Sequence, residues 1–210
     1  VLSHAHYDHA NGMEKFFEIN RKAPFYLQEG CGENCYFKKG FIRKYIGIPK
    51  GITKKYQDRI EYVSGVYTVA DGIYLVSHST PHLEQIGKKE MMYQKTKLGW
   101  KPDNFCHEQS LVLDTDGGLV IFNSCSHGGV VNIINEVKAA FPNKKITALI
   151  GGFHIFNHPE AEIRELAKLI KETGIERIYT GHCSKERGYR ILREELGDMA
   201  GQFYVGMELV

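Results

Sequence analysis

The sequence predicts an α/β fold in which helices pack in layers on β-sheets. Strand-like and helix-like segments alternate from Ser110 onward, and several of the strands are followed by a histidine. With 210 residues, 42% of them hydrophobic, the chain is long enough to bury a core of its own. We therefore expect one domain over 1–210, in which about 30–105 form an inserted or capping region.

The second half shows its elements in a regular order. The stretch SLVLDTDGGLVIF contains two apolar runs around an Asp-Gly-Gly turn, which indicates a β-hairpin. After it we expect helices near 130–141, 159–173 and 188–196, with strands at ITALIG, ERIYTG and QFYVG. This alternation is typical of helices packed on a sheet.

The first half is less regular. A helix is expected over 11–22, because Met13, Phe16, Phe17 and Ile19 recur at helical spacing. From about 24 to 103, short strand-like runs such as IEYV and GIYLVS alternate with loops rich in Gly, Lys and Tyr. We interpret this stretch as an insertion or recognition region.

Composition narrows the function classes. A formal net charge of +2 favours neither a nucleic-acid binder nor a polyacid, and no run of about 18 apolar residues or signal peptide is present. The five cysteines are an odd, scattered set, which fits reduced thiols in a soluble, cytoplasmic protein. A metal clip at Cys31 and Cys35 is the weaker alternative.

Three successive strands each carry a histidine just beyond their last residues. LVIFNS is followed by His127, ITALIGG by His154 and ERIYTG by His182. The carboxyl ends of parallel strands form the edge where α/β sheets collect their chemistry. One such histidine is ordinary, but three in register indicate a site.

The chain opens with a second histidine cluster, HAHYDH. His4 and His6 are two residues apart, so on an extended segment both imidazoles face one side and can share a metal ion. Asp8 and His9 follow as the chain turns into a helix, where they can serve a second ion. Such a pair of cations about 3.5 to 4 Å apart can activate a water molecule.

These motifs resemble a known family. HAHYDH followed by an NG-led helix is similar to the HxHxDH motif of the metallo-β-lactamase superfamily, which implies an αββα sandwich with one or two zinc ions at the sheet edge. Within it, NSCSHGGVVNII, ALIGGFHIF and YTGHCS resemble the branch of 7,8-dihydropterin-6-methyl-4-(β-D-ribofuranosyl)-aminobenzene-5′-phosphate synthase-like hydrolases. The motifs span nearly the whole chain but fix no substrate.

The resemblance implies a ligand set. It makes His4 and His6 ligands of the first metal, and Asp8, His9 and His182 ligands of the second. We choose His127 to complete the first site, with His107 as the alternative.

The resemblance also bears on the edge residues and on the start of the chain. Cys125 stands where relatives carry a bridging aspartate and is either a thiolate ligand or, as we favour, a small buried residue. His154 would lie over the metals and bind substrate or pass protons. Relatives carry several dozen residues before the motif, so we expect N-terminal strands to be missing here or supplied by another chain.

The implied activity is hydrolysis by a metal-bound hydroxide, oriented by Asp8. His6 stands where oxygen-reducing diiron relatives carry a glutamate, so zinc is the expected ion, with iron or manganese as alternatives. A non-catalytic, zinc-stabilised binding module is the alternative outside the enzymes.

A basic segment suggests the substrate. Eight basic residues and one acidic residue lie between 38 and 59, which is either a solvated surface or an anion-binding cap. We expect 30–59 to be mostly helical or loop-like, with Lys38, Lys39, Arg43 and Lys44 facing a small, phosphate-bearing substrate. A metal-dependent nuclease or phosphodiesterase is the alternative, although no nucleic-acid-binding domain is apparent and no nucleic-acid or membrane partner is expected.

Overall fold

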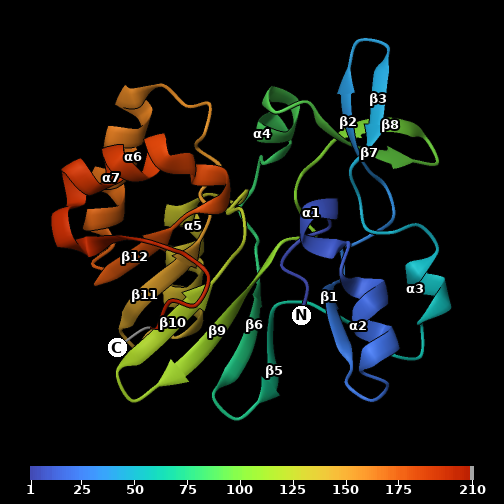
Figure 1. The fold of residues 1–210 in the computed structure, drawn as a ribbon, viewed down its shortest axis with the longest axis horizontal. Coiled ribbons are helices and arrows are strands. Elements are labelled where there is room, and N and C mark those ends of the chain that lie inside the picture. The colour runs from blue at the N-terminus through green and yellow to red at the C-terminus, as the bar shows by residue number, and fades with distance from the viewer. Residues whose placement is uncertain (209–210) are drawn as a thin grey trace. The chain divides into compact units, whose positions relative to one another are not determined.

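The computed structural model describes residues 1–208 (Figure 1). By its internal contacts the chain forms two compact units. Unit 1 holds Val1–Tyr67 and Ser77–Gln109, and unit 2 holds Thr68–Val76 and the chain from Ser110 onward. The expectation of one domain with an inserted segment stays a prediction.

Unit 2 is built on a seven-stranded sheet with the order β13-β12-β11-β10-β9-β6-β5. Strands β10, β11, β12 and β13 run parallel to one another, and β9 pairs with β10 as the expected hairpin. The strands are β5 Val66–Ala70, β6 Ile73–Ser77, β9 Gln109–Thr115, β10 Gly118–Phe122, β11 Ile146–Gly151, β12 Arg177–Thr180 and β13 Ala200–Gln202. The last strand therefore begins before the QFYVG stretch in which it was expected.

The helices of unit 2 pack on this sheet through one core. They are α5 Val130–Ala140, α6 Glu160–Glu172 and α7 Lys185–Leu196, close to the predicted ranges. Ile133 of α5, Ile163 of α6 and Leu192 of α7 are buried in the same cluster as Leu119 and Ile121 of β10. Each helix connects two parallel strands, so every parallel strand ends at one common edge.

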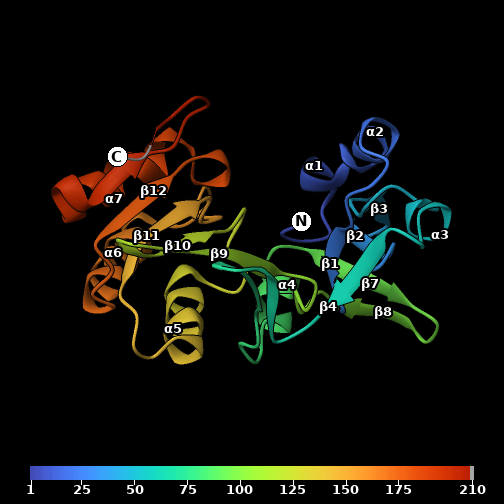
Figure 2. The same ribbon diagram turned by 90° about the horizontal axis from the view of Figure 1, so that it is seen from below.

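Unit 1 contains two smaller sheets and four short helices. A four-stranded antiparallel sheet has the order β3-β2-β7-β8, and β1 pairs in parallel with β4. Its elements are α1 Tyr7–Ala10, α2 Met13–Ile19, β1 Phe25–Gln28, β2 Cys35–Lys39, β3 Ile42–Tyr45, α3 Ile52–Lys55, β4 Ile60–Val63, α4 Glu84–Lys89, β7 Met92–Thr96 and β8 Gly99–Pro102. Met13 and Phe17 anchor α2 in a core that also contains Leu27 of β1 and Ile52 of α3. Figure 2 shows these elements from a second direction.

Two local expectations need correction. The helix predicted over 11–22 is shorter, because α1 precedes it and α2 ends at Ile19. Most of the cap predicted over 30–59 is loop or short helix, as expected, but β2 and β3 form a hairpin there that was not predicted. Gly40 takes a φ of 57° at the turn, and the aromatic residues that flank it favour strands over helices.

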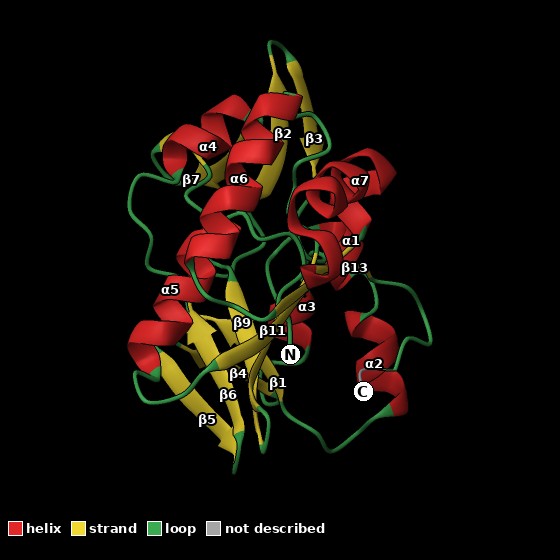
Figure 3. Ribbon diagram, turned by 90° about the vertical axis from the view of Figure 1, so that its left-hand side faces the viewer, coloured by secondary structure: helices red, strands yellow, loops and turns green. Residues whose placement is uncertain are grey.

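The mixture of helices and sheets confirms the α/β class (Figure 3). No helix within residues 1–208 combines the length and the apolar character needed to cross a membrane.

Candidate metal centre

The opening histidines converge in unit 1. His4 and His6 lie on the segment before α1, which bends at Ser3–Ala5, and their ring centroids are 4.7 Å apart. The ring of His9, on α1, lies 4.5 Å from that of His4, and Asp8 Oδ2 lies 3.4 Å from His9 Nε2. The structure thus brings together the four residues of HAHYDH that we expected to bind metal.

Hydrogen bonds to distant strands fix this segment. Leu2 N–H donates to the Tyr26 carbonyl on β1, and Gln109 N–H donates to the Ser3 carbonyl. Tyr7 N–H donates to the Ile46 carbonyl just after β3. The histidine cluster is therefore held between segments far apart in the sequence.

Burial sets the charge of His6. His4 and His6 are almost fully buried, whereas Asp8 remains exposed. Burial, followed by the nearby charge of His107, lowers the pKa of His6 to about 3. His6 is therefore neutral near pH 7, which is the form of histidine that binds metal ions.

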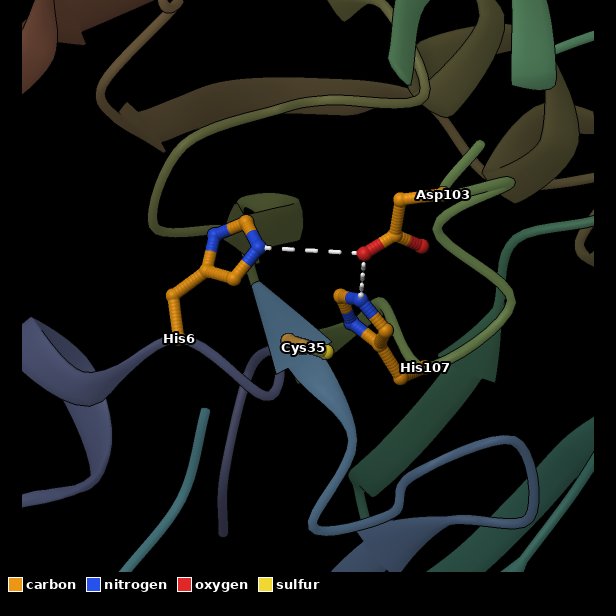
Figure 4. Close-up of side chains that lie close together, drawn as sticks. All are labelled: His6, Cys35, Asp103 and His107. Atoms are coloured by element: carbon orange, nitrogen blue, oxygen red, sulfur yellow. Dashed lines mark hydrogen bonds and ion pairs between the residues drawn. The ribbon is translucent and has the colours of Figure 1, made fainter. Parts of the chain in front are cut away.

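Behind His6 lies a carboxylate that the sequence analysis missed. Asp103 is fully buried, and its Oδ1 accepts hydrogen bonds from Phe105 N–H and from Gln94 Nε2, both at 2.8 Å. Its Oδ2 lies 3.2 Å from His107 Nε2 and 4.0 Å from His6 Nε2 (Figure 4). Burial by itself raises the pKa of Asp103, but the charge and hydrogen bond of His107 lower it below its usual range.

His107 has both ring nitrogens engaged. The Ala5 N–H approaches Nδ1 at 3.2 Å, and Nε2 lies 3.2 Å from Asp103 Oδ2, so an Nε2 proton points at Asp103. A metal on Nε2 would require the other tautomer, whose Nδ1–H would meet the Ala5 N–H. His107 therefore supports Asp103, and its alternative role as a metal ligand stays a prediction.

Cys35, on β2, completes a group of four buried side chains. Its Sγ lies within 4.8 Å of ligand atoms of His6, Asp103 and His107 (Figure 4). Such a set could hold a metal ion. Burial raises the pKa of Cys35 and raises that of Cys31 to about 12, so both remain thiols. Cys31 is not part of this group, and the metal clip at Cys31 and Cys35 stays the weaker alternative.

In unit 2 the strand-end histidines lie at the expected edge. The rings of His127, after β10, and His154, after β11, are 4.5 Å apart. His182 begins the short 3-10 helix η1 (His182–Ser184) directly after β12. Ser126, His154 and His182 have φ values of 50 to 55°, an uncommon conformation outside glycine. Such backbone strain is concentrated at functional sites in proteins.

Paired glycines let these strand ends approach each other. A Cβ on Gly151 would lie 1.9 Å from the Asn123 carbonyl oxygen, and one on Gly152 would lie 2.5 Å from Cys183 Sγ. The Ser126 hydroxyl donates to the Gly152 carbonyl at 2.8 Å. The GG pair is therefore required by close backbone approach at this edge.

Comparisons with known proteins agree with these motifs. Over 98% of its length the chain is 27% identical to the 7,8-dihydropterin-6-methyl-4-(β-D-ribofuranosyl)-aminobenzene-5′-phosphate synthase of Methanocaldococcus jannaschii, of which it covers 72%. It is also 26% identical, over 88% of its length, to an uncharacterized protein of the same organism, of which it covers 68%. No family model matches the chain.

A solved structure decides the fold. The chain superposes over its full length, with a TM-score of 0.81 and 24% identity, on 77% of Tm1679, a metal-dependent hydrolase of the β-lactamase superfamily. The chain has the metallo-β-lactamase fold. The resemblance to this superfamily and its synthase-like branch is thereby confirmed.

Within this metallo-β-lactamase fold, two cysteines accompany the histidines of unit 2. Sulfur atoms of Cys125 and Cys183 and a ring nitrogen of His154 lie within 4.8 Å of one another. A hydrogen bond from Cys125 outweighs the effect of burial and, with His154, lowers the pKa of Cys183 to about 5. Cys125 is buried and lies near ionisable neighbours, so the choice between a thiolate ligand and a small buried residue stays a prediction. Cys183 was missed, although its place beside His182 was a signal.

The four basic residues expected to bind substrate do not share one surface. Lys38 pairs with Arg43 and Phe37 with Lys44 across the β2–β3 hairpin, so Lys44 points to the opposite face from Lys38 and Arg43. The Lys44 ammonium lies 5.6 Å from the Tyr7 ring centroid, beside the HAHYDH motif. Lys39 pairs with Ile42 next to the turn. Only Lys44 of the four has a cation–π contact with a residue of the metal-binding motif.

Proposed function

We propose that this chain is a metal-dependent hydrolase with a dinuclear site, with zinc as the expected ion, acting on a small phosphate-bearing substrate. The observation that carries the proposal is the convergence of His4, His6 and His9 beside Asp8. Three imidazole groups and one carboxylate form a ligand set that suits zinc. Iron and manganese are the alternative ions. Two bound divalent ions would lower the pKa of a water molecule and stabilise negative charge on the substrate.

The proposed ligands are the residues that match the superfamily motifs. They are His4, His6, Asp8, His9, His127 and His182. The motif resemblance supports this assignment, and the strained backbone at His182 adds to it. His6 is kept neutral by burial, and Asp103 lies within 4.0 Å of its Nε2, so its Nδ1 is the better placed nitrogen for a metal.

Other side chains have proposed roles in the reaction. Asp8 is exposed beside His9, so its second oxygen can accept a proton from the attacking water or orient it. His154, in contact with the His127 ring, is proposed to bind substrate or pass protons. Lys44 is proposed to attract the phosphate, since it lies beside the motif and carries positive charge. The 5′-phosphate in the name of the archaeal synthase supports this substrate class.

Metal content tests the first half of the proposal. Protein purified without chelator should contain more than one equivalent of zinc, iron or manganese by elemental analysis. His4→Ala and His127→Ala should each lower this content, whereas His158→Ala, a histidine that pairs with Glu162 on the surface, should not. A protein that stays free of metal when zinc is added would contradict the proposal.

Hydrolysis tests the second half. Phosphomonoester, phosphodiester, lactone and thioester substrates should be screened with added zinc or manganese, and the phosphate-bearing ones should be cleaved. Asp8→Asn should reduce kcat by about 10²-fold or more if Asp8 handles the proton of the attacking water. Equal rates for wild type and Asp8→Asn would mean that the activity belongs to a contaminant.

A further inference from the structure

The four-stranded sheet of unit 1 carries unbalanced positive charge. Strands β2, β3, β7 and β8 contain basic side chains but no acidic one. Within residues 1–208, none of these cations forms an ion pair with a carboxylate. They are Lys38, Lys39, Arg43, Lys44, Lys95 and Lys101. The whole protein has a net charge of only +2, so the positive charges are concentrated on this sheet. They repel one another, and an anionic partner would relieve that repulsion.

Strand register places aromatic rings together on one face of this sheet. Tyr36 pairs with Tyr45 on β3 and with Tyr93 on β7, so the three rings form a row across three strands. The Trp100 ring lies 5.0 Å from the Tyr36 ring. Cys35 and Gln94, the neighbours of Tyr36 and Tyr93, are buried on the other face. The row therefore points away from the His6 and Asp103 cluster, and none of its rings is fully buried.

Basic groups lie over these rings. The Lys38 ammonium is 5.1 Å from the Tyr93 centroid, and the Lys95 ammonium and Arg43 guanidinium are 4.8 and 5.3 Å from that of Trp100. Lys50, from the loop after β3, lies 4.7 Å from the Tyr45 centroid. We call this surface the aromatic–basic face. It consists of Tyr36, Lys38, Arg43, Tyr45, Lys50, Tyr93, Lys95 and Trp100.

We propose that the aromatic–basic face binds single-stranded nucleic acid. Unpaired bases present flat rings that stack on aromatic side chains, and the phosphates that link them are neutralised by lysine and arginine. A duplex hides its bases in the stack, so it would meet only the charges of this face. The proposal concerns a surface separate from the metal ligands and does not depend on the hydrolase proposal.

The pairing of β2 with β7 argues against a membrane as the partner of this face. The fully exposed side chains Phe41 and Leu98 lie at the β2–β3 and β7–β8 turns. Because Phe37 pairs with Met92 while Cys35 pairs with Gln94, these two turns lie at opposite ends of the sheet. One flat bilayer could not take up both apolar tips, whereas the face between them is continuous.

Trp100 provides a direct probe, because it is the only tryptophan in the sequence. Single-stranded oligonucleotides of about twelve nucleotides should quench its fluorescence and should bind at least tenfold more tightly than a duplex of the same length. Equal affinity for the duplex would overturn the proposal, because it would leave charge as the only attraction. Binding to phosphatidylserine vesicles with no binding to oligonucleotides would replace the strand by a lipid surface.

Matched variants distinguish binding at this face from attraction to the positive charge of the protein in general. Replacing Lys38, Arg43 and Lys95 together by Gln should make the slope of log affinity against log salt shallower by about 2, measured by anisotropy of a labelled strand. Tyr36→Leu should weaken binding about fivefold or more through lost stacking. Replacing Lys15, Lys145 and Lys168 by Gln removes the same charge elsewhere and should change affinity much less. Equal losses in the two triple variants would refute the proposed face.

Discussion

Asp103 is the residue whose replacement should be most informative about how the metal site is supported. In Asp103→Asn, the amide oxygen can keep the Gln94 and Phe105 bonds, but the amide NH2 then faces His107 Nε2–H. If the His107 proton moved from Nε2 to Nδ1, it would instead face the Ala5 N–H, and two donors would again point at each other. We expect the metal-free protein to lose about 1–3 kcal/mol of unfolding free energy in urea denaturation.

The same variant should lower zinc affinity by about 10- to 100-fold, because Asp103 would no longer orient His6. Asp116→Asn, on the exposed β9–β10 turn, is the matched control and should leave both quantities unchanged. If Asp103→Asn binds zinc as the wild type does, Asp103 serves packing alone.

His6 allows a prediction about pH. Burial and the nearby His107 lower its pKa from 6.5 to about 3, so nitrogen NMR of the chelator-treated protein should show a neutral ring from pH 8 to below pH 5. The unfolded chain takes up the proton below about 6.5, so His6 should make the metal-free protein less stable as the pH falls from 6.5 towards 3. His6→Gln should flatten this dependence. A His6 signal that titrates near 6.5 would show that the ring is accessible to water.

At the scale of elements, the parallel ends of β10 and β11 depend on Gly151. A Cβ there would lie 1.9 Å from the Asn123 carbonyl, so Gly151→Ala must push the two strand ends apart. We expect a loss of about 1–3 kcal/mol in urea denaturation, together with weaker metal binding as the edge that carries His127 and His154 shifts.

The matched control is Gly117→Ala in the same unit, where the nearest atom lies at an ordinary 3.6 Å. It should change the unfolding free energy little. Equal stability of the two variants would mean that the strand ends can separate without cost.

At the scale of the whole molecule, bound zinc should stabilise the folded chain against unfolding. A ligand at one hundred times its Kd adds about 2.7 kcal/mol of stability. Trp100 fluorescence reports on unit 1, and amide exchange in β10, β11 and β12 reports on unit 2. Zinc added to the chelator-treated protein should raise the unfolding free energy that these probes report, and a chelator should reverse this gain. No change in unfolding at any zinc concentration would contradict zinc binding by the folded chain.

Sequence patterns alone determined the α/β class, the HAHYDH cluster and the histidines after β10, β11 and β12. Each of these depends on short-range information: apolar periodicity, a two-residue spacing, and the rule that parallel strands end at one edge. The same local information misjudged the β2–β3 hairpin, because dense positive charge does not distinguish a strand from a loop.

Tertiary structure alone decided which groups support the ligands. Asp103 and His107 reach the HAHYDH segment across a sequence separation of about a hundred residues, as the Ala5–His107 bond shows with a separation of 102. The tertiary structure also separates the basic residues: Lys44 lies beside Tyr7, whereas Lys38 and Arg43 lie on the aromatic–basic face. Burial, tautomer and strand register arise from contacts between distant segments, and local sequence spacing does not specify which distant segments will meet.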